Sequence, residues 1–144
     1  MSGPAEHAKA LFHAAWELID LPSRRPDQDR LMLATAMASR RLWEEAGGNQ
    51  ERIVGDWQVA HAASLSGHAT VALDFAQAAV DRAETSDVPT WVLASAYEGL
   101  ARARAVAGDT PGRDAAAQRC RELLVQVADL DDRALIQTQL ETVP

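Results

Sequence analysis

Histidine is the first residue type in this chain that could do chemistry, because its imidazole binds metals and transfers protons near neutral pH. The four histidines are His7, His13, His61 and His68. Two metal ligands on one helix face need a spacing of three or four residues, whereas these pairs lie six and seven residues apart. His13 and Glu17 do have i,i+4 spacing, but one such pair arises easily by chance. We therefore predict no metal site and no cofactor.

The sequence offers equally little for nucleophilic catalysis. Cys120 is the single cysteine, and it lies among Ala116, Leu123 and Leu124 at helical spacing, which is typical of a buried apolar thiol. The chain has no Gly-x-Ser-x-Gly motif, no Gly-x-x-x-x-Gly-Lys phosphate loop and no Gly-x-Gly-x-x-Gly motif. We therefore predict that the protein is not an enzyme.

The four tryptophans are better suited to binding than to catalysis. Trp16, Trp43, Trp57 and Trp91 fall on four different predicted helices. Each could be a large core residue whose indole N–H finds a partner nearby. Alternatively, two or more of them could line a groove that holds a partner, because aromatic anchors carry much of the binding energy at interfaces.

Two acidic residues stand among apolar neighbours, each beside an aromatic residue. These are Asp56 and Glu98, and Arg40, Arg52 or Arg102 could pair with them. Such pairs could fix the register of neighbouring helices, or they could form a polar pocket in a concave face. The candidate partner-binding residues are Arg40, Trp43, Arg52, Asp56, Trp57, Tyr97 and Glu98.

The elements that must position these residues are helices. Alanine, the best helix former, supplies 29 of the 144 residues, whereas Gly and Pro together supply 14. Apolar residues recur at helical spacing between the Gly and Pro positions, with no convincing strand. The predicted helices cover about 4–21, 27–47, 49–67, 68–85, 88–107 and 111–128, with a short seventh helix around Leu135 and Leu140. Short loops predict antiparallel neighbours, so the chain is expected to be all-α.

A weak internal repeat relates the third and fourth predicted helices to the fifth and sixth. Ala60 lies seven residues before the turn glycine Gly67, and Ala101 lies seven residues before Gly108. This pattern, over about 50–128, resembles the tetratricopeptide repeat, although Gly67 and Gly108 are 41 residues apart and that repeat has about 34. The resemblance implies helical hairpins stacked as a short right-handed solenoid, with 1–144 as one domain.

A second stretch, 39–58, resembles small bacterial tetratricopeptide-like proteins. It contains a tryptophan at Trp43, an asparagine at Asn49 and the run Asp56-Trp57-Gln58 in the order seen there. No activity is attached to those proteins, so this resemblance supports the fold and leaves the function open.

The charge balance excludes some partners. The net charge of −7 and the pI of about 5.0 argue against nucleic acid and against an anionic membrane surface. No basic start followed by an apolar run is visible, and one cysteine suits a reducing compartment, so a cytoplasmic protein is expected.

The sequence therefore predicts a non-enzymatic interaction protein that presents a helical groove to a peptide or protein partner. The alternative is a small-molecule-binding or enzymatic helical bundle with a pocket of Arg, Asp, Glu and Trp. An open groove would favour the first, and an enclosed polar cavity the second. The apolar first helix, with Leu11, Phe12 and Trp16, also predicts a homodimer formed through the N-terminal helices.

Overall fold

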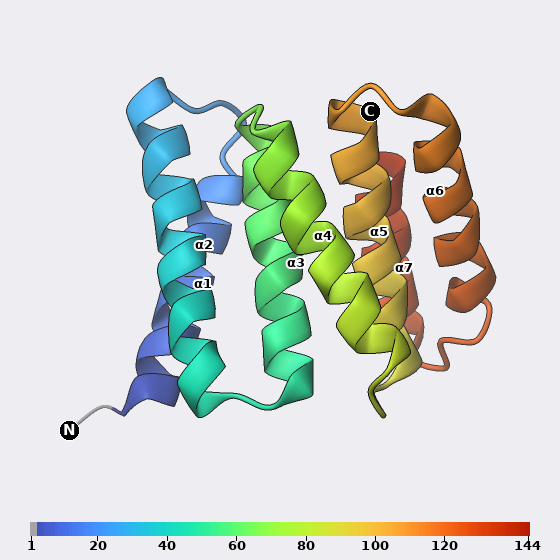
Figure 1. Cartoon of the computed structure of the whole chain (residues 1–144), viewed down its shortest axis with the longest axis horizontal. Coiled ribbons are helices and arrows are strands. Elements are labelled where there is room, and N and C mark those ends of the chain that lie inside the picture. The colour runs from blue at the N-terminus through green and yellow to red at the C-terminus, as the bar shows by residue number, and fades with distance from the viewer. Residues whose placement is uncertain (1–2) are drawn as a thin grey trace.

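The computed structural model describes residues 3–144, and that part of the chain forms seven α-helices and no strand (Figure 1). The prediction of an all-α fold is confirmed. Within the same residues, no helix combines the length and the apolar character that crossing a membrane requires. The helices are α1 (Pro4–Ile19), α2 (Pro26–Ala46), α3 (Asn49–Leu65), α4 (Ala69–Glu84), α5 (Thr90–Val106), α6 (Thr110–Leu124) and α7 (Leu130–Glu141).

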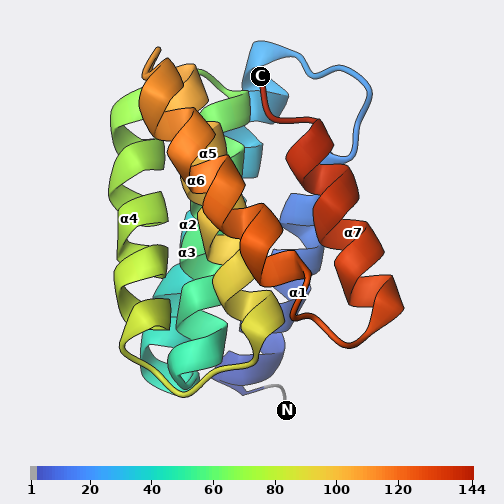
Figure 2. The same cartoon turned by 90° about the vertical axis from the view of Figure 1, so that its right-hand side faces the viewer.

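Consecutive helices pack as pairs, and the pairs stack side by side. The closest pairings are α1 with α2, α3 with α4, and α5 with α6, while α3 also packs on α5 and α5 on α7 (Figure 1). Seen from the side, α4 and α7 lie on opposite sides of the molecule (Figure 2). The odd-numbered helices thus share one face, and the even-numbered helices cover the other.

Two matching turns set the geometry of the α3–α4 and α5–α6 pairs. Gly67 and Gly108 have φ values of 79° and 81°, the left-handed region that glycine adopts without strain. The residue after each glycine donates its backbone N–H to a carbonyl five residues earlier, at 2.9 Å in both turns. This is the Schellman arrangement that ends helices. The glycines that mark the sequence repeat therefore make the same turn.

The core is built largely from alanine, which lets helix axes approach closely. Fully buried alanines on α3 and α5 include Ala60 and Ala101, the small residues of the repeat. Two hydrogen bonds between helices add to this packing. Ser39 Oγ donates to the Ala8 carbonyl and Gln58 Nε2 donates to the Phe12 carbonyl, both at 2.8 Å. The Ser39 bond joins α1 to α2, and the Gln58 bond joins α1 to α3.

The predicted starts of the second and sixth helices are each one residue too late. The prediction starts the second helix at residue 27, whereas α2 begins at Pro26, preceded by Arg25, whose backbone N–H donates to Gln28 Oε1. The prediction starts the sixth helix at residue 111, whereas α6 begins at Thr110, and its cap Asp109 accepts a hydrogen bond from the Gly112 backbone. Pro26 suits the first helical position of α2, and the Asp109 carboxylate sets the start of α6.

Candidate functional site

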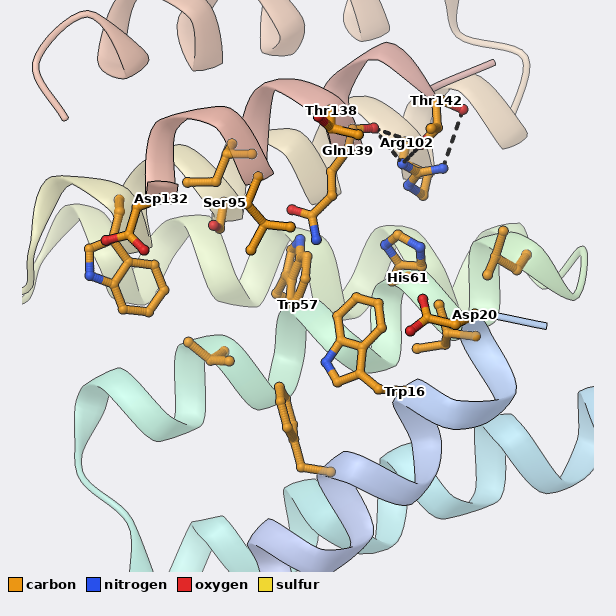
Figure 3. A pocket seen from close by; sticks show the side chains of 17 residues that line it. Trp16, Asp20, Trp57, His61, Ser95, Arg102, Asp132, Thr138, Gln139 and Thr142 are labelled. Atoms are coloured by element: carbon orange, nitrogen blue, oxygen red, sulfur yellow. Dashed lines mark hydrogen bonds between the residues drawn. The ribbon is translucent and has the colours of Figure 1, made fainter. Parts of the chain in front are cut away.

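A groove runs along the face that the odd-numbered helices share, with a cavity volume of about 890 Å³ (Figure 3). We call it the odd-helix groove. Its surface is mainly apolar and aromatic, and helices α1, α3, α5 and α7 all contribute to it. The lining residues are Phe12, Trp16, Ile19, Asp20, Val54, Trp57, His61, Leu65, Trp91, Ser95, Arg102, Asp132, Leu135, Ile136, Thr138, Gln139 and Thr142.

Three rings form the wall of this groove. The ring centroids of Trp16 and Trp57 are 5.4 Å apart, and His61 lies 5.6 Å from Trp16 and 5.7 Å from Trp57. Distances and tilts of this kind are favourable for aromatic pairs. Because the rings pack on one another, they present one continuous surface to the groove (Figure 3).

Trp57 is held in place from below by a buried carboxylate. Its indole Nε1–H donates to Glu98 Oε2 at 2.9 Å, which joins α3 to α5. Gly99 allows this approach, because a Cβ there would lie 2.7 Å from Trp57 Cδ1. Glu98 is fully buried and forms an ion pair with Arg102, whose Nη2 lies 3.0 Å from Glu98 Oε1. The charges of this pair offset each other beneath the groove.

Arg102 also binds the C-terminal end of α7, which forms one side of the groove. Its Nη2 lies 2.6 Å from Thr142 Oγ1 and 2.9 Å from the Gln139 carbonyl oxygen (Figure 3). These contacts use the exposed carbonyls at the C-terminal end of α7, where a cation is favoured by the helix dipole. The Glu98–Arg102 pair therefore connects α3, α5 and α7 around the groove.

His61 is the titratable group most strongly affected by this environment. Burial, with a smaller contribution from the nearby charges of Arg102 and Arg24, lowers its pKa from 6.5 to about 3. Among residues 3–144, its Nδ1 is one of three buried side-chain polar atoms without a hydrogen-bond partner. His61 is therefore a neutral ring at physiological pH with an unused hydrogen-bonding atom.

This pKa makes a prediction for stability. Between pH 6.5 and about 3 the unfolded chain binds a proton at His61 that the folded chain does not bind. The stability contribution of neutral His61 is complete above pH 6.5 and is lost as the pH falls toward 3. A single proton changes the free energy of unfolding by about 1.4 kcal/mol per pH unit in this window.

Denaturant melts at about pH 6.5 and about pH 4.5 measure this effect. Between these pH values, we expect the free energy of unfolding of His61→Gln to fall by about 2 kcal/mol less than that of the parent chain. His13→Gln makes the same chemical change at an exposed position, so it is the matched control and is melted at the same two pH values. Equal pH dependence in the parent and His61→Gln would show that His61 is not held neutral by the fold.

The seven candidate residues predicted from the sequence lie in three different places. Two of them reach the odd-helix groove, since Trp57 lines it and Glu98 lies directly beneath it. Tyr97, by contrast, faces the even-numbered helices. Its hydroxyl donates to Glu84 Oε1 at 2.6 Å, and the Arg119 guanidinium lies 5.9 Å from its ring centroid.

The other four candidates, Arg40, Trp43, Arg52 and Asp56, meet at the α2–α3 interface. Asp56 is buried and pairs with Arg40, one of the three arginines considered as partners, with Nε 2.5 Å from Oδ1. Burial raises the pKa of Asp56 although the Arg40 hydrogen bond opposes this change. Arg52 instead donates to the carbonyls of Trp43 and Glu44 at the end of α2.

Trp43 also lines a smaller recess of about 190 Å³, whose lining includes Lys9 and Glu51. This recess shares Phe12, Val54 and Trp91 with the odd-helix groove, so the two are adjacent.

Sequence reasoning missed several groove residues. Asp20 and Asp132 lie at or near helix ends, where a single acidic residue carries no pattern, and Leu135 was used only to place the seventh helix. His61 was considered only as a metal ligand. Within residues 3–144, no group of three or more His, Cys, Asp or Glu side chains is placed to hold a metal ion. Cys120 is buried, and burial raises the pKa of its thiol to about 12, so the nucleophilic thiolate is disfavoured.

Comparison with known proteins gives no further assignment. No family model, no curated protein sequence and no solved structure matches this chain.

Proposed function

We propose that this chain is a non-enzymatic, tetratricopeptide-like interaction protein that holds a peptide segment of a partner in the odd-helix groove. The observation that carries the proposal is the shared lining of this groove by four helices from successive pairs. The matching Gly67 and Gly108 turns and the stacked pairs support the tetratricopeptide-like part of the proposal.

The surface chemistry of the groove favours a peptide with apolar side chains. Trp16 and Trp91 are half-buried, and Leu135 is 59% exposed at the edge of the groove. Large apolar side chains left open in a concave surface are typical of recognition sites. Aromatic anchors in such a site supply most of the binding energy.

A small-molecule ligand is the second candidate. A volume of about 890 Å³ is within the range of small-molecule sites, which runs from about 300 to 1,000 Å³. The unpartnered Nδ1 of His61 adds a polar atom of the kind that orients a small ligand. The peptide remains our first proposal because the groove continues toward the smaller recess, which suits an extended occupant.

Selection of short peptides from a random display library against the full chain tests this proposal. Leu135→Gln should weaken the selected peptides about tenfold or more, because it removes the apolar surface of one leucine from the groove. Val125→Gln is the matched control, because Val125 is 77% exposed and lies outside the groove lining. It should leave binding unchanged.

Peptides that bind the parent and Leu135→Gln equally well would place recognition elsewhere and contradict the proposal. The library could instead yield no binder, while a metabolite co-purifies with the native protein and with Val125→Gln but not with Leu135→Gln. That result would favour the small-molecule function.

A further inference from the structure

The odd-helix groove is lined by more negative than positive charge. In the described part of the chain, the charged side chains that line it are Asp20, Arg102 and Asp132. The positive charge of Arg102 is offset by Glu98, which is fully buried beneath it. The two aspartates are therefore the unbalanced charges of the groove.

Neither aspartate is neutralised by a neighbour. Within residues 3–144, no side-chain hydrogen bond or ion pair involves the carboxylate of Asp20 or of Asp132. The arginines close to these aspartates in the chain bind other groups. Arg24 pairs with Asp29 and donates to carbonyls at the end of α1. Arg133 donates to the Val127 carbonyl.

The two carboxylates lie at opposite ends of the aromatic wall. Figure 3 shows Asp20 at the end of α1 beside His61, and Asp132 on α7 at the far side of Trp57. Asp20 is exposed and Asp132 is half-buried, so both can meet a charged group on a ligand. Between them lie Trp16, which is half-buried, and Trp57, which is only 6% exposed (Figure 3).

His61 adds an independent sign that this surface is built for an occupant. Its ring lines the groove and is only 7% exposed, and its Nδ1 is without a hydrogen-bond partner in the described residues. A buried polar atom left unpaired lowers stability, and native structures contain few of them. Because the ring is uncharged, it leaves the negative balance of the groove unchanged.

We infer that the odd-helix groove selects a peptide segment with an apolar centre and basic residues on both sides of it. The apolar side chains pack on Trp16, Trp57 and Leu135, and a Lys or Arg on each side reaches Asp20 or Asp132. This inference rests on the proposed function and names the chemistry of the partner. Charge complementarity of this kind sets specificity and increases the association rate.

Two synthetic fluorescent peptides test the inference by anisotropy with the full chain at low salt. Both carry leucines three and four positions apart, and they differ only in having two arginines or two glutamates at each end. The arginine peptide should bind about tenfold tighter, because exposed charge contacts change from attraction to repulsion. The preference should shrink as salt is added.

The double variant Asp20→Asn/Asp132→Asn should reduce the preference to about threefold or less, because the rest of the chain still has a net negative charge. Replacement of two exposed acids outside the groove, Asp74 and Glu122, with Asn and Gln is the charge-matched control. This control should leave the preference intact.

Equal binding of the two peptides, a preference that survives in the Asp20/Asp132 variant, or no binding at millimolar peptide would each overturn the inference. If binding is weakened by Leu135→Gln but shows no charge preference, the inference fails while the proposed function stands. Binding that Leu135→Gln does not weaken argues against the groove, and hence against the proposed function itself.

Discussion

Glu98→Ala should lower the free energy of unfolding by about 3–5 kcal/mol, because it leaves Arg102 as an uncompensated buried charge. Glu98 is fully buried and Arg102 is 3% exposed, so water cannot replace the lost carboxylate. The same substitution also removes the acceptor of the Trp57 indole N–H. Denaturant melts followed by circular dichroism measure the change.

An exposed ion pair provides the matched control for this prediction. Arg41 and Glu45 have the same i,i+4 spacing at 2.9 Å, but their side chains are largely exposed. Glu45→Ala should change the free energy of unfolding by no more than about 0.5 kcal/mol. Replacing both buried partners, as in Glu98→Leu/Arg102→Met, should recover much of the loss. A loss under about 1 kcal/mol for Glu98→Ala would mean that the pair does not hold α5 and α7 together.

Asp56→Ala should lower the free energy of unfolding by about 2–4 kcal/mol. Asp56 is 4% exposed and binds Arg40, whose position also depends on the close approach of Gly55. The expected loss is smaller than for Glu98, because Arg40 keeps a second partner in Glu44 at 2.9 Å. Thermal or denaturant melts of the variant measure it.

Glu44→Ala is the control for Asp56→Ala, because it removes the other partner of Arg40. The side chain of Glu44 is half exposed to water. It should leave stability nearly unchanged, because exposed ion pairs contribute little. Peptide binding should survive in both variants, since Asp56 lies at the α2–α3 interface outside the groove lining. A near-neutral melt for Asp56→Ala would contradict a buried pair, and loss of peptide binding with unchanged stability would make Asp56 a binding residue instead.

Most of the helical architecture could be predicted from the sequence, because its signals are local. Gly67 and Gly108 end helices through their left-handed conformation, and the prolines near helix starts fix the first turn. The exact helix starts were harder to predict. Asp27 and Thr110 are each a plausible cap by residue type, but Pro26 takes the first position of α2 and the Asp109 carboxylate caps α6.

The candidate site could be predicted only in part, because it depends on contacts between distant segments. Trp57 and Glu98 were each recognised as unusual, but their hydrogen bond joins residues 41 positions apart and requires the close packing of α3 on α5 at Gly99. Tyr97 stands next to Glu98 in the chain, yet a helix turns adjacent residues about 100° apart, so Tyr97 contacts α4 and α6 instead of the groove.

The groove itself left no pattern in the sequence. Asp20 and Asp132 can be recognised as groove residues only when the positions of α1 and α7 relative to α3 and α5 are known. His61 shows the same limit, since its low pKa results from burial among side chains of other helices. Sequence patterns describe which face of a helix is apolar, whereas a groove arises from the gap that several such faces leave.

An NMR titration of the labelled full chain with the arginine-flanked peptide tests most directly whether the odd-helix groove is the binding surface. The indole and amide resonances of Trp16, Trp57 and Trp91, assigned with Trp→Phe variants, should shift together and saturate with the peptide. Resonances of α4 and of Tyr97, on the opposite face, should stay in place. Shifts confined to α2, α4 and α6, with the three groove tryptophans unchanged, would contradict the account.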